Sequence, residues 1–202
     1  MSTKIVIDCD PGHDDAIAIL LALASPEVEL TGVTTVAGNQ TLDKTTRNAL
    51  VTLEIAGRSD IPVAAGAEAP LRRELRTAAH VHGETGLDGP ELHEPSSRPV
   101  GGPAADFLAE LSDFFQQFHE RSYGFGGSPI HDAMAIAHVI DPTLVTTRHA
   151  NVAVETRSEL CDGRTVVDLR GVTGREPNAD VGVDVDAERF LELLVSRIAS
   201  LP

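Results

Sequence analysis

Aromatic and basic side chains are scarce in this chain of 202 residues. It has no tryptophan, one tyrosine and six phenylalanines, so the core must be built mainly from aliphatic side chains. Only 16 lysines and arginines stand against 31 acids, which gives a net charge of −15. Nucleic acids and anionic membranes are therefore not expected partners, because both require basic surfaces.

Cysteines and long apolar runs are few as well. The two cysteines, Cys9 and Cys161, lie far apart and form no zinc-type spacing or disulfide framework, which favours a reducing, cytoplasmic compartment. No apolar run reaches the length of a membrane span, and no signal peptide is expected. Motifs for a phosphate-binding loop, a dinucleotide fold and a serine nucleophile elbow are also missing.

The apolar periodicity of the first third predicts alternating strands and helices. Strands are expected at residues 4–8, 28–36 and 61–64, and helices near 14–25 and 41–56. This order predicts an α/β fold with a mainly parallel sheet, right-handed crossovers and flanking helices. Hydrophobic residues make up 42% of the chain, which is enough for one core.

The rest of the chain predicts a long loop and then further helices and strands. Residues 66–103 are rich in glycine, proline and charge, and predict a loop that could be functional. After it we expect helices at 107–118, 132–140 and 190–198, and strands near 143–147, 151–157, 165–168 and 181–185. Four phenylalanines share one stripe of the helix at 107–118, which is typical of a core or subunit-facing helix.

Residues 8–15 read Asp-Cys-Asp-Pro-Gly-His-Asp-Asp and gather four carboxylates on the turn between the first strand and the first helix. Like charges so close together are unfavourable unless a cation neutralises them. Oxygen donors favour a hard divalent cation, calcium more than magnesium if most ligands are protein oxygens. The segment is not an EF-hand loop, because Ile19 stands where that loop needs a bidentate acid.

Residues 8–15 and the apolar run after them resemble the N-terminal signature of the inosine–uridine-preferring nucleoside hydrolases. Further stretches resemble motifs of that family in the same order, namely residues 35–39, 81–89, 128–133 and 171–175. The resemblance implies a single shortened domain over 1–202 that lacks a central segment near residues 98–102. In the family, that segment carries an Asn/Glu/Asn set that grips the ribose.

The resemblance implies hydrolysis of the N-glycosidic bond of ribonucleosides such as inosine or uridine, in purine or pyrimidine salvage. It makes Asp10 the general base and His131 the donor of a proton to the leaving base. Asp14, Asn39 and His82 would contact the substrate. The family also implies a homodimer or a homotetramer.

The same resemblance implies that Asp10, Asp15 and Asp132 bind Ca²⁺, which would hold the attacking water and lower its pKa. Two other interpretations stay open because the ribose-gripping set is missing. The chain could be a catalytically impaired, calcium-binding pseudo-enzyme. It could also be an engineered truncated form that acts only as a binding or structural module.

Each candidate residue also has a purely structural interpretation. An acidic turn is common at the surface or at a helix N-terminus, where Asp14 and Asp15 would be favourable whatever the function. Asn39 and Asp132 could each cap the helix that follows them. His82 could be an ordinary loop histidine.

Overall fold

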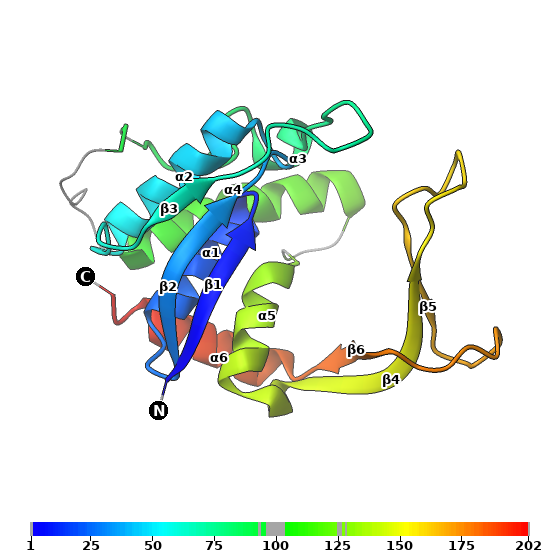
Figure 1. The fold of residues 1–202 in the computed structure, drawn as a ribbon. Helices are drawn as coiled ribbons and strands as arrows, with labels where there is room; N and C mark the ends of the chain where they lie inside the picture. The colour runs from blue at the N-terminus through cyan, green and yellow to red at the C-terminus, as the bar shows by residue number, and fades with distance from the viewer. Residues whose placement is uncertain (1, 93, 96–103, 125–126, 128, 202) are drawn as a thin grey trace.

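The computed structural model describes residues 2–92, 94–95, 104–124, 127 and 129–201, and for residues 104–112 it describes the backbone only. The expected deletion junction near 98–102 lies outside these residues. A body with a parallel sheet and several helices carries a projecting antiparallel arm (Figure 1). This arrangement confirms the α/β fold with helices around a parallel sheet.

The parallel sheet has the order β1-β2-β3. Its elements, in chain order, are β1 (Thr3–Cys9), α1 (His13–Leu23), β2 (Val28–Thr35), α2 (Leu42–Ile55) and β3 (Val63–Ala65). Each of these elements was expected from the apolar periodicity. The helix α2 is followed by Gly57 at φ 68°, a backbone conformation that glycine adopts without strain.

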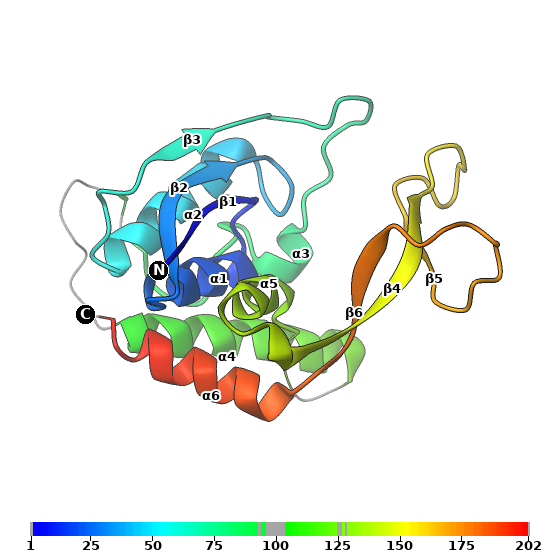
Figure 2. The same cartoon turned by 60° about the horizontal axis from the view of Figure 1, so that its bottom comes forward.

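Helix α1 lies at the centre of the body. Its residues 16–22 are at most 3% exposed. The sheet covers one side of α1, while α4 (Ala104–Tyr123), α5 (His131–Ile140) and α6 (Ala187–Ile198) lie around the others (Figures 1 and 2). A helix enclosed in this way needs apolar residues all round, as the run of Ala, Ile and Leu provides.

Strand β1 forms one edge of the parallel sheet and covers the core with only one of its faces. Ile5 and Ile7 pack against the core, whereas Val6 between them is 61% exposed. The alternation follows from the two-residue period of a strand.

The segment 66–103, expected as a loop, contains the short helix α3 (Ala79–His82). A four-residue helix shows no apolar periodicity, so the sequence pattern gives no sign of it. Helices α4 and α5 are confirmed, although α4 is longer than expected. In α6, Phe190, Leu194 and Ile198 are buried at helical spacing, and the Asp186 side chain caps its first turn.

The arm consists of β4 (Val145–Val154), β5 (Thr165–Asp168) and β6 (Ala179–Val185), antiparallel and in the order β5-β4-β6 (Figure 2). The two strands expected at 143–147 and 151–157 are wrong, because residues 145–154 form one strand after the 3₁₀ turn Pro142–Leu144. Arg148 and His149 interrupt the apolar pattern there. They are tolerated because much of β4 is exposed.

Within the part of the chain that the structure describes, no helix combines the length and the apolar character needed to cross a bilayer.

Candidate functional site

Asp14 and Asp15 lie in the first turn of α1, directly after the carboxyl end of β1. Asp15 is buried, and its Oδ2 accepts a hydrogen bond of 2.9 Å from the Gly12 N–H. The helix N-terminus favours negative charge, so the local backbone stabilises acids at these positions. The turn therefore presents two carboxylates to the interior of the site.

Helix α5 brings a third carboxylate to the same place. Asp14, Asp15 and Asp132 offer ligand atoms that all lie within 4.8 Å of one another. Asp14 Oδ1 is buried and has no hydrogen-bond partner among the described residues, and a bound cation could satisfy such an oxygen. The donors are all carboxylate oxygens, so the residues fit a hard divalent cation.

Burial and mutual repulsion dominate the electrostatics of this cluster. Burial, followed by the charge of Asp132, raises the pKa of Asp15 to about 8. Burial, followed by the charge of Asp14, raises the pKa of Asp132 to about 6, and burial likewise raises the pKa of Asp14. A divalent ion would reverse these shifts, because it favours the ionised carboxylates.

Asp10 lies beside the cluster rather than within it. Burial is the main cause of the raised pKa values of Asp14 and Asp15, and the nearby charge of Asp10 adds to the rise. Asp10 Oδ2 accepts a hydrogen bond of 2.7 Å from the Asn39 N–H. The carboxyl ends of β1 and β2 thus meet at this edge, where ligands bind in parallel sheets.

His82, expected in a loop, is the buried last residue of α3. Its Nδ1 lies 3.1 Å from Nδ1 of His13, and the two rings stack at a centroid distance of 5.3 Å. Burial lowers the pKa of both histidines to about 4, so both are neutral near pH 7. A side chain at Gly12 would collide with His82, so this ring lies directly against the acidic turn.

His131 is the exposed first residue of α5. Burial is the main cause of the raised pKa values of Asp14 and Asp132, and the positive charge of a protonated His131 opposes that rise, so it lies near the acidic cluster. The structure therefore brings His131 together with these two acids. Its exposure leaves it accessible to a bound molecule.

Two buried polar residues support this region although no role for them follows from the sequence. His13 is fully buried between the rings of His82, Phe114 and Phe115, and its Nε2 donates to the Asp88 carbonyl at 2.9 Å. Asn48 of α2 is also fully buried. Asn48 interrupts the apolar stripe of α2, and a polar residue at such a position is the sequence feature that could have indicated its role.

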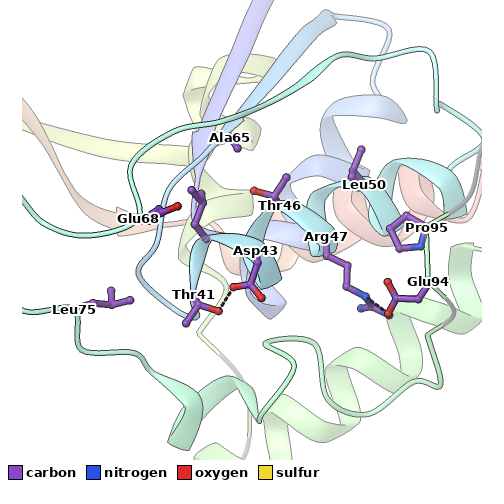
Figure 3. A pocket seen from close by; sticks show the side chains of 11 residues that line it. Thr41, Asp43, Thr46, Arg47, Leu50, Ala65, Glu68, Leu75, Glu94 and Pro95 are labelled. Carbon is purple, nitrogen blue, oxygen red and sulfur yellow. Dashed lines mark hydrogen bonds and ion pairs between the residues drawn. The ribbon is translucent and has the colours of Figure 1, made fainter.

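A separate groove of about 840 Å³ lies along α2 (Figure 3). Thr41, Asp43 and Leu50 are among the residues that line it, as are Arg47 and Glu94, which form an ion pair. None of the residues that line this groove is a predicted site residue. The groove is therefore distinct from the acidic cluster.

The chain matches the family model of the inosine-uridine preferring nucleoside hydrolases over residues 5–111 and again over residues 97–192. It is 34% identical over 308 residues to the pyrimidine-specific ribonucleoside hydrolase RihA of Enterobacter sp. strain 638, covering 98% of each protein. It is 36% identical over 307 residues to RihA of Salmonella schwarzengrund, covering 98% of this chain and 99% of that protein.

These alignments are longer than the chain itself. The first extends over 308 positions, whereas the chain has 202 residues, so more than one hundred positions have no counterpart here. The two stretches that match the family model meet and overlap at residues 97–111. The chain is thus shortened relative to these hydrolases.

Solved structures agree on the fold. A purine-preferring ribonucleoside hydrolase from Gardnerella vaginalis superposes with a TM-score of 0.85 at 22% identity, over 98% of both chains. A plant nucleoside hydrolase gives a TM-score of 0.81 at 24% identity, over 99% of this chain and 100% of that one. With the matches in sequence, these findings establish that the chain belongs to the inosine-uridine preferring nucleoside hydrolase family.

Proposed function

We propose that the protein hydrolyses the N-glycosidic bond of ribonucleosides to free base and ribose, with Ca²⁺ at the acidic cluster. The observation that carries the proposal is the convergence of Asp14 and Asp15 of α1 with Asp132 of α5, whose ligand atoms lie within 4.8 Å of one another. Cleavage passes through an oxocarbenium-like ribosyl cation, and fixed negative charge stabilises such a state.

The ligands we propose for Ca²⁺ are Asp10, Asp15 and Asp132. Asp14 is a further candidate, because its carboxylate lies with those of Asp15 and Asp132 and one of its oxygens is buried with no partner in the part of the chain that the structure describes. When bound, the cation would lower the pKa of a water molecule. An all-oxygen site favours calcium over softer metals.

Asp10 is the general base in this proposal. It lies next to the cluster and is held by the Asn39 N–H, so its carboxylate can take a proton from water. His131 would donate a proton to the departing base, and its place at the exposed start of α5 supports this role. Asp14, Asn39 and His82 would contact the nucleoside.

Several finer points stay predictions. Inosine and uridine are the expected substrates, and uridine is the natural first choice because the RihA relatives are named as pyrimidine-specific. A cytoplasmic location, a role in salvage and a homodimer or homotetramer are expected from the sequence.

Release of free ribose from uridine and inosine tests the proposal. We expect turnover with Ca²⁺ and none with excess chelator. Because Asp10 is the proposed base, Asp10→Ala should lower kcat by about 10²–10⁴-fold. The exposed Asp113 of α4 offers a matched control, and Asp113→Ala should leave kcat unchanged. Intact turnover in Asp10→Ala would contradict the assignment of the base.

A calcium-binding module without turnover is the second candidate function. It is favoured by the more than one hundred alignment positions that the chain lacks. Tight calcium binding measured by calorimetry, with no ribose released from either nucleoside, would support this alternative. Contacts that hold the sugar provide much of the geometry that the reaction needs, so losing them would strongly lower the rate of hydrolysis.

A further inference from the structure

The turn after β2 lies against the acidic turn after β1. The Val36 N–H donates to the Cys9 carbonyl at 3.0 Å, which keeps the ends of the two strands together. A side chain at Gly38 would overlap the carboxylate of Asp10. The backbone at residues 38–39 thus approaches Asp10 more closely than a residue with a Cβ would allow.

Asn39 contacts both the proposed general base, Asp10, and a proposed cation ligand, Asp15. Its backbone N–H donates to Asp10 Oδ2 at 2.7 Å. Its side-chain Nδ2 donates to the Asp10 carbonyl and to Asp15 Oδ2, each at 3.1 Å. Both acceptors are oxygens, so the amide nitrogen must face them, and both of its hydrogens are used inside the protein.

The remaining contacts fix Asn39 and Asp15 from either side. The Asn39 carbonyl accepts a hydrogen bond of 3.0 Å from the Ala78 N–H, which ties the turn to the segment before α3. Asp15 Oδ2 also accepts from the Gly12 N–H at 2.9 Å. Two donors therefore engage this one oxygen of Asp15, and Oδ1 is left for another partner.

We propose that Asn39 is a positioning residue that fixes the carboxylates of Asp10 and Asp15 relative to each other before any nucleoside binds. This goes beyond the ribose contact expected for Asn39 and rests on the proposed role of Asp15 as a cation ligand. Only the side-chain Oδ1 of Asn39 remains for a sugar hydroxyl, because both amide hydrogens are engaged.

Calcium binding without nucleoside distinguishes positioning from a ribose contact. Asn39→Leu keeps the size of the side chain but removes both amide donors. We expect its Kd for Ca²⁺, measured by calorimetry, to rise about 10–100-fold, the usual effect of removing a group that orients a metal ligand. If Asn39→Leu fails to fold, Asn39→Ser, which keeps one short donor, should also raise the Kd.

Asn151 on β4 offers a matched control, because it is also half-buried and its Nδ2 donates to the Glu176 carbonyl at 2.7 Å. Asn151→Leu should leave the Kd for Ca²⁺ unchanged. If Asn39→Leu binds Ca²⁺ like the unmodified protein and only its KM for uridine rises, Asn39 is a ribose contact and the positioning role is wrong. If the unmodified protein binds no Ca²⁺, the proposed metal site and the positioning role both fail.

Discussion

At the scale of single residues, the site combines buried acids with buried neutral histidines. Asp15 and His13 are both enclosed, and both have pKa values shifted toward their neutral forms. The physical cause is the same, because burial disfavours whichever form carries charge. Asp15 stays largely protonated at neutral pH unless a cation binds, whereas His13 is neutral there and donates a hydrogen bond to the Asp88 carbonyl.

His13→Phe tests the contribution of that hydrogen bond. Phenylalanine can keep the stacking against Phe114 and Phe115 but cannot donate to the Asp88 carbonyl. We expect the free energy of unfolding, measured with urea, to fall by about 1–3 kcal/mol. His149→Phe on the arm should change it by less than about 0.5 kcal/mol, because that side chain is exposed. Equal effects would contradict this prediction.

At the scale of elements, α2 connects parts of the chain that are far apart in sequence. The Nδ2 of Asn48 donates to the Pro11 carbonyl at 3.0 Å and to the Thr85 carbonyl at 2.9 Å. One side chain of α2 therefore holds both the acidic turn and the loop after α3. Side chains that satisfy two backbone groups in this way define the position of irregular segments.

Asn48→Ala should release both segments from α2. Each carbonyl left without a donor costs about 1–3 kcal/mol of stability where it is buried, so we expect a clear fall in the urea midpoint. Leu50 on the same helix is 38% exposed, and Leu50→Ala should cost less. A smaller effect for Asn48→Ala than for Leu50→Ala would show that this link is unimportant.

At the scale of the whole molecule, pH and calcium act on stability together. Folding raises the pKa of Asp15 from 3.8 to about 8. Without metal, the contribution of Asp15 to the free energy of unfolding is therefore present below pH 3.8 and is lost as the pH rises toward 8. His13 and His82 act in the opposite direction. Folding lowers their pKa values from 6.5 to about 4. Their contribution to the free energy of unfolding is therefore present above pH 6.5 and is lost as the pH falls toward 4.

Calcium should therefore stabilise the protein more at pH 8 than at pH 5. At pH 5 the cation must displace protons from Asp15 and Asp132, whose pKa values are about 8 and about 6. Thermal melting with calcium and with chelator, at both pH values, measures this difference. An equal calcium-induced rise in Tm at pH 5 and pH 8 would contradict the assignment of these acids as ligands.

The sequence by itself determined the elements of the parallel sheet and the place of the acidic turn. Apolar periodicity is a local property, so it located β1, α1, β2 and α2 and put residues 8–15 at a strand end. Motif resemblance indicated the family, which the comparisons establish. A short helix such as α3 and a polar, exposed strand such as β4 lack this periodicity, and neither was identified correctly.

Only the tertiary structure decided which side chains meet. Asp132 reaches Asp14 and Asp15 because α5 packs against α1, and sequence spacing contains no information on that contact. The same holds for Asn39, which sequence alone could not distinguish from a helix cap. Long-range packing fixes these distances, burial then sets the pKa values, and both depend on residues far apart along the chain.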